Sequence, residues 1–146
     1  MRKVALALGL LTTTAFVYAN DPLHGTTWRT IDDETKKPKA IVKFTENPTG
    51  VLSASIQQIL TPGEENSCKS CEGKYKNVTL KGLKIVYNLK ADGKGGYKGG
   101  KIYNPREDKT YSLAGKVGSD GKLHLRGYLG LKGLGLGRDQ IWEPVK

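Results

Sequence analysis

Apolar and polar residues alternate along most of the chain, with the two-residue period of strands that bury one face. The clearest run extends from Tyr97 to Trp142, where three alternating segments are separated by Asn104-Pro105 and by Ser119-Asp120-Gly121. Both separators are turn-forming sequences, so this half of the chain predicts a run of β-hairpins. No strong amphipathic helical period is present outside the first twenty residues, and no internal repeat is evident.

The same alternation continues upstream and predicts about eight strands in total. The predicted strands are 26–31, 39–45, 51–60, 82–90, 97–103, 109–117, 122–129 and 139–144. The interior-facing sets that the alternation assigns are Leu52, Ala54, Ile56 and Gln58 in 51–60, and Leu83, Ile85, Tyr87 and Leu89 in 82–90.

Eight short antiparallel strands in one chain favour a small closed up-and-down barrel. Closure removes the unpaired edges that a flat sheet of this size would expose, and a barrel of eight strands has room for one small ligand. Trp28 and Trp142, near the first and last strands, are suited to plug one end of such a barrel. A β-sandwich is the alternative architecture.

The first nineteen residues have the features of a secretory signal peptide. Met1-Arg2-Lys3 is followed by an apolar run from Val4 to Leu11, which is too short to span a bilayer, and Val17-Tyr18-Ala19 precedes the expected cleavage site. We therefore expect residues 20–146 to be a single exported barrel domain without a membrane span. The periplasm is the favoured location, with release outside the cell as the alternative.

The chain is basic, with a formal charge of +10 that falls to +8 when Arg2 and Lys3 are removed with the signal peptide. In an exported protein such a surface favours an anionic envelope polymer or lipid headgroups over nucleic acid. The lysines are scattered through the predicted strands, so a merely solvated surface is favoured over a binding patch.

The two cysteines, Cys68 and Cys71, lie in the most polar part of the chain, the long segment 61–81. In an oxidising compartment this spacing predicts a short-loop disulfide. Redox catalysis is disfavoured, because no strand and helix N-terminus flank the pair. A zinc site completed by His24 and His124 is disfavoured by their spacing, so no metal is expected. The segment itself is a candidate lid over a barrel mouth, or else a plain loop.

Two further features resemble chemical motifs without meeting their requirements. The glycine-rich run Gly130 to Gly137 lacks the Gly-Lys-Ser/Thr ending and the following helix of a phosphate loop, so it predicts a flexible loop before the last strand. The carboxylates of Asp32, Asp33 and Glu34 stand beside lysines in a predicted turn, where solvated side chains are typical. The sequence thus indicates no cofactor and no catalytic set.

The chain resembles an exported bacterial family catalogued as domain of unknown function 2147. The resemblance rests on Gly-x-x-Trp at Gly25, Gly-Gly-Lys-Ile-Tyr-Asn-Pro-Arg at 99–106, Lys-Thr-Tyr at 109–111, Leu-His-Leu-Arg-Gly-Tyr-Leu-Gly at 123–130 and Gly-Arg-Asp-Gln-Ile-Trp at 137–142. It covers essentially the whole mature chain and implies a lipocalin-like barrel. Because the family has no settled activity, it implies no catalytic residues.

Three functions remain open from the sequence. A non-catalytic barrel that binds a small apolar or amphipathic ligand is favoured, since tyrosine rings give contact area and arginine can meet an anionic head. The candidate ligand-binding residues are Trp28, Tyr87, Tyr103, Tyr111, Arg126 and Tyr128. The first alternative is a structural or interaction protein of the envelope that uses its basic surface.

An enzyme is the least favoured of the three. His124 is the one candidate acid-base group, but it lies between Leu123 and Leu125. If those two leucines face inward, the alternation turns His124 outward.

Overall fold

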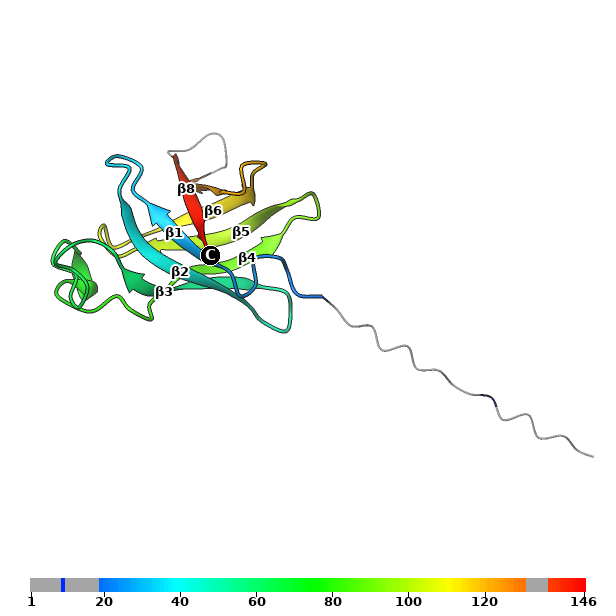
Figure 1. The fold of residues 1–146 in the computed structure, drawn as a ribbon, viewed down its shortest axis with the longest axis horizontal. Coiled ribbons are helices and arrows are strands. Elements are labelled where there is room, and N and C mark those ends of the chain that lie inside the picture. The colour runs from blue at the N-terminus through cyan, green and yellow to red at the C-terminus, as the bar shows by residue number, and fades with distance from the viewer. Residues whose placement is uncertain (1–8, 10–18, 131–136) are drawn as a thin grey trace, which may run out of the picture.

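The computed structural model describes Gly9 and residues 19–130 and 137–146. They form a closed barrel of eight antiparallel strands, in which each strand pairs with the next and β8 returns to pair with β1 (Figure 1). The strands are β1 (Thr27–Ile31), β2 (Pro38–Glu46), β3 (Leu52–Ile59), β4 (Lys84–Ala91), β5 (Gly96–Asn104), β6 (Lys109–Val117), β7 (Leu123–Tyr128) and β8 (Gly137–Val145). The predicted up-and-down barrel is confirmed, and the pairing of β1 with β8 rules out the sandwich.

Two of the sequence predictions concern residues outside the described part of the chain. Nearly all of the predicted signal peptide, residues 1–19, lies outside it, as does the interior of the glycine-rich loop, residues 131–136.

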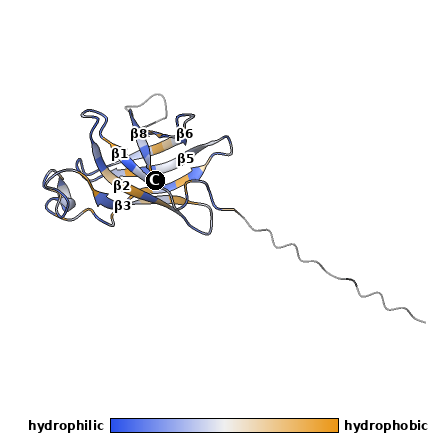
Figure 2. Cartoon of the chain, viewed as in Figure 1, coloured by the Kyte–Doolittle hydropathy of each residue, from blue (hydrophilic) through white to orange (hydrophobic). Residues whose placement is uncertain are grey.

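The core lies inside the barrel, where inward side chains of every strand meet. Apolar residues are concentrated in the strands, whereas the turns and the segment 61–81 are largely hydrophilic (Figure 2). Phe44 and Trp142 are fully buried, with ring centroids 6.3 Å apart. Burial of two such large side chains contributes several kcal/mol each to the free energy of unfolding.

The predicted interior face of β3 is wrong at its last position. Leu52, Ala54 and Ile56 are buried as predicted, but Gln58 is exposed and Ile59 is buried in its place. The register between β2 and β3 shifts between Ile41 and Val42, opposite this point. A β-bulge adds one residue and so reverses which side chains face inward beyond it.

The chain segment before β1 closes one end of the barrel. Leu23 is buried, and the backbone N–H of Asp21 donates to Glu46 Oε2 at 2.7 Å. Tyr97 is buried and donates its hydroxyl to Asp21 Oδ1 at 2.8 Å. Both burial and the neighbouring Asp21 carboxylate raise the pKa of Tyr97, so this phenol stays protonated as a donor. Because the segment before β1 closes this end of the barrel, the cavity opens at the opposite end.

Candidate ligand-binding cavity at the barrel mouth

The open end of the barrel, here the mouth, leads into a cavity of about 150 Å³. The mouth is formed by the β1–β2 turn, the segment 61–81 between β3 and β4, and the β5–β6 turn, which gather at one end of the barrel (Figure 1). The cavity walls are mostly aliphatic and come from six strands, β2 to β7, and from segment 61–81: Ala40, Ile56, Ile59, Leu80, Ile85, Ile102, Leu113 and Leu125.

Trp142 and Gly127 also line the cavity. The indole N–H of Trp142 donates to Gln140 Oε1 at 3.0 Å, and Gln140 also lines the cavity. Gly127 leaves space, since a Cβ built there would meet nothing closer than Tyr111 Cβ at 3.6 Å. The cavity thus owes part of its volume to a missing side chain on β7.

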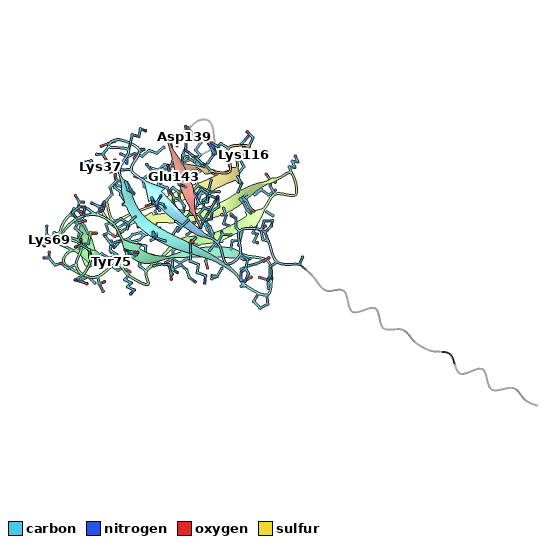
Figure 3. All side chains as sticks on the ribbon, viewed as in Figure 1. Lys37, Lys69, Tyr75, Lys116, Asp139 and Glu143 are labelled. Carbon is cyan, nitrogen blue, oxygen red and sulfur yellow. A yellow bond between two sulfur atoms is a disulfide. The ribbon has the colours of Figure 1, made fainter. Side chains whose placement is uncertain are left out.

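Segment 61–81 packs against the barrel at the mouth, and we call it the lid segment. Its one helical turn is η1 (Gly73–Tyr75), and Leu80 near its end is buried and lines the cavity. Cys68 and Cys71 form the predicted disulfide, and both are buried. Tyr75 and Lys69 both belong to this segment, beyond the end of the barrel (Figure 3). The disulfide is therefore a structural link inside the lid segment.

Arg106, in the β5–β6 turn, joins the lid segment to the barrel. Its guanidinium donates to Ser70 Oγ at 2.5 Å, to Thr61 Oγ1 at 3.0 Å and to Glu64 Oε2 at 3.0 Å. Glu64 is itself buried, and its other oxygen accepts the backbone N–H of Ser70 at 2.7 Å. Burial alone would favour the neutral acid, but these hydrogen bonds and the arginine charge outweigh it and lower the pKa of Glu64.

An aromatic pair supports the same contact between lid segment and turn. Tyr75 packs against Tyr103 of β5 with ring centroids 5.7 Å apart, and Lys74 Nζ lies 5.3 Å from the Tyr75 ring. The Tyr103 hydroxyl donates to Asp108 Oδ1 at 2.6 Å. Burial and then the Asp108 carboxylate raise the pKa of Tyr103, which keeps the phenol neutral.

A second polar group lies across the mouth, between β6 and β8. The Tyr111 hydroxyl donates to Glu107 Oε2 at 2.6 Å, and Arg138 Nη1 lies 3.4 Å from Glu107 Oε1. The hydrogen bond to Glu107 raises the pKa of Tyr111. Arg138 remains about half exposed, so its guanidinium can reach a molecule that enters the mouth.

The structure places two of the six candidate ligand-binding residues at the cavity, Tyr103 and Tyr111. Trp28 is buried outside the cavity lining, where its indole N–H donates to Thr26 Oγ1 at 2.8 Å. Arg126 faces the outside of the barrel and pairs with Asp139 at 2.9 Å. Tyr128, near the start of the β7–β8 connection, does not line the cavity either.

Tyr87 shows a second error in the predicted faces. It is 38% exposed on the outer surface, and its hydroxyl donates to the Lys84 carbonyl at 2.8 Å. The cause is that Ile85 and Val86 are both buried, where the register between β3 and β4 shifts. The alternation predicted over 82–90 is therefore broken before it reaches Tyr87.

The sequence interpretation missed Arg106 and Trp142 as cavity residues. Arg106 ends the motif Asn-Pro-Arg, and a turn arginine next to a strand tyrosine was a usable signal for the rim. Its partner Glu64 lies 42 positions away in the sequence, so only the fold reveals their contact.

His124 and the potential metal ligands form no catalytic or metal-binding arrangement in the described residues. His124 Nε2 lies 2.9 Å from Asp120 Oδ2 on the outer surface. Within residues 19–130 and 137–146, no three His, Cys, Asp or Glu side chains converge as a metal-binding group. No helix in these ranges is long and apolar enough to span a bilayer.

A closed eight-stranded up-and-down barrel with an internal cavity open at one end defines a lipocalin-like protein. The family model described as "Uncharacterized protein conserved in bacteria (DUF2147)" matches residues 26–144, and the chain belongs to this family.

One solved structure similar to this chain is described as "Protein HP1028 from the human pathogen Helicobacter pylori belongs to the lipocalin family". It is 26% identical in sequence, with a TM-score of 0.68, and the match covers 88% of this chain and 85% of that protein. No curated protein sequence matches the chain significantly. The lipocalin-like fold expected from the family resemblance is thus confirmed.

Proposed function

We propose that this protein is an exported, non-catalytic binding protein that holds a small apolar or amphipathic ligand in its barrel cavity. The observation that carries the proposal is the cavity itself, whose walls are aliphatic and whose rim is polar. Concave, mostly apolar sites with a few polar groups are the usual form of small-molecule sites. The lipocalin-like fold adds support, because barrels of this size hold single small ligands.

The size of the cavity limits the ligand. About 150 Å³ is less than the roughly 300–1,000 Å³ of pockets that enclose drug-sized molecules. A cavity of this volume holds about one benzene-sized group. The proposed ligand therefore buries one ring or one short alkyl chain.

The polar part of the ligand stays at the rim. Tyr111 offers a hydrogen-bonding group there, and the half-exposed Arg138 offers a positive charge. Arg138 already lies within 4.0 Å of Glu107, Asp33 and Glu34, so an anionic head would have to compete with three carboxylates. A neutral or singly charged head fits this rim better than a multiply charged one.

The export part of the proposal rests on the N-terminal sequence features and on the disulfide. A buried disulfide between Cys68 and Cys71 suits an oxidising compartment such as the periplasm. The proposal assigns no cofactor and no catalytic residue.

A titration with benzoate, octanoate and octanol tests the binding site. The variant Gly127→Val should fill the cavity from β7 while leaving the strand intact, because a Cβ fits there without a clash. The matched control is Ser55→Val, which adds similar bulk on the outer face of β3. We expect at least one probe to shift NMR signals of Leu113, Leu125 and the Trp142 indole in the wild type and in the control, but not in Gly127→Val.

Probe binding that is unchanged in Gly127→Val would place the site elsewhere and contradict the proposal. Absence of binding by all three probes, together with association to anionic polymers, would instead favour the interaction protein considered as the alternative.

A further inference from the structure

Acidic and basic residues are distributed unequally around the barrel. Strands β3 to β6 contain six lysines and neither aspartate nor glutamate. On the other side, cations are paired: Arg29 with Glu143 at 3.4 Å and Arg126 with Asp139 at 2.9 Å. Glu143 and Asp139, which Figure 3 labels, both lie on β8. One side of the barrel is therefore electrically balanced and the other is not.

Four exposed lysines of the β4–β5 hairpin define what we call the lysine wall: Lys84, Lys90, Lys98 and Lys101. Every Asp and Glu of the chain lies among the described residues, and none is within 4.0 Å of these four ammonium groups. Over the length of β4, the wall extends about 20 Å along the strand direction.

The carboxylates in the neighbouring turns are engaged elsewhere. Asp92, in the β4–β5 turn, accepts the backbone N–H of Lys94 at 2.7 Å and that of Gly96 at 3.0 Å. Asp108 and Glu107, in the next turn at the mouth, accept the hydroxyls of Tyr103 and Tyr111. The acidic residues thus stabilise turns and tyrosines, and none of them forms an ion pair with the lysine wall.

The pairing within the hairpin brings like charges together. Lys90 on β4 lies directly opposite Lys98 on β5. Like charges at directly opposed positions destabilise a β-hairpin, and an anion placed between them would remove the repulsion. The hairpin therefore presents a position for a negative group that the protein itself does not fill.

The surroundings of the wall are polar, and the charged side chains of the adjacent strand β6 are again lysines, Lys109 and Lys116. The outward side chains of the adjacent strand β3 are Ser53, Ser55, Gln57 and Gln58, and Lys101 Nζ donates to Ser112 Oγ of β6 at 3.0 Å. The one large hydrophobic side chain exposed on β4 and β5 is Tyr87, and its hydroxyl is hydrogen-bonded to the backbone. A bilayer would demand apolar side chains that insert, whereas hydroxyls and amides beside cations suit a chain of acidic sugars.

We propose that the lysine wall is a docking surface for an acidic polysaccharide, separate from the cavity at the mouth. The repeated negative charges of such a polymer match the spaced ammonium groups along the hairpin, and its hydroxyls match the polar side chains of β3. Because lysine ammonium groups act as point charges without a planar fork, recognition depends on charge density more than on one sugar sequence. The association should therefore weaken steeply as salt is added.

The test measures binding of the mature protein to polygalacturonate, with neutral dextran as the reference polymer, by fluorescence anisotropy at low and physiological salt. The wall variant replaces Lys84, Lys90, Lys98 and Lys101 with Gln. The matched control replaces Lys37, Lys69, Lys76 and Lys146 with Gln, which removes the same charge from other exposed positions. We expect affinity for polygalacturonate to fall about tenfold or more in the wall variant and about twofold or less in the control.

A second variant, Lys98→Glu, separates binding from folding. It places a carboxylate opposite Lys90, so the thermal midpoint should rise while affinity for the polymer falls. Equal losses in the wall variant and the control would overturn the proposal, because net charge alone would then explain binding. So would absence of binding to polygalacturonate at low salt. Tighter binding to vesicles that contain phosphatidylglycerol than to the polymer would also overturn it, in favour of a membrane partner.

Discussion

At the scale of single residues, Arg106 is the side chain on which the mouth depends. It makes three hydrogen bonds to the lid segment, and one of them neutralises the buried Glu64. Other cations at the rim are more exposed, so their ion pairs contribute less to the free energy of unfolding. In addition to the Tyr75–Tyr103 contact, the lid segment is thus held to the β5–β6 turn by one charged side chain.

The variant Arg106→Met should lower the free energy of unfolding by about 2 kcal/mol, because a buried carboxylate loses its charged partner. Urea denaturation provides the measurement. Arg138→Met is the matched control, and since Arg138 is about half exposed its effect should stay below about 0.5 kcal/mol. If both variants had the same effect, Arg106 would be no more than another surface cation.

The pH dependence of stability should report on Glu64. Its pKa is lower in the folded protein than the ordinary value of 4.5, so its charge stabilises the fold above that pH, and the stabilisation is lost as the pH falls through the folded pKa. The stability of the wild type and of Glu64→Gln should differ most near neutral pH and converge in acid. The exposed Glu72→Gln should follow the wild type throughout. A difference that is constant across this range would contradict the role given to the Glu64 charge.

At the scale of elements, the sequence predicts all eight strands, because each has an alternating face and ends at turn residues. Faces are predicted incorrectly at Gln58 and Tyr87, next to shifts of register. A bulge depends on how two strands fit together, and one strand's sequence does not contain that information. The cavity could not be predicted for the same reason, because its lining combines residues of several strands with a residue of the lid segment.

The disulfide should matter locally. Cross-linking positions only three apart in sequence constrains a short loop, so replacing Cys68 and Cys71 with Ala should reduce stability by about 2 kcal/mol. Hydrogen exchange measured by NMR locates the effect. The amide of Cys68, which donates to the Val78 carbonyl, and the amide of Asn77, which donates to the Cys68 carbonyl, should both exchange faster. Strand amides should change much less. Uniformly faster exchange across the barrel would show that the disulfide supports the whole fold instead.

At the scale of the whole molecule, the barrel has three distinct regions. Its closed end is filled by Leu23 and sealed by Tyr97 and Asp21, its mouth opens into an aliphatic cavity, and its outer wall carries lysines without ion pairs. The barrel follows from the alternation, but the residues that fill and seal its closed end, Leu23, Tyr97 and Asp21, were not predicted from the sequence. The cavity does not follow from the alternation either, because it results from the absence of a side chain at Gly127 and from a lid held by distant residues.

The central claim, that the cavity holds a small ligand, is tested most directly by native mass spectrometry of the protein purified from its own source without reducing agent. We expect a discrete mass above that of the oxidised chain, which is released on denaturation and is absent from Gly127→Val purified in the same way. A wild-type protein that carries no added mass, and weighs only two hydrogens less than the reduced chain, would contradict the claim.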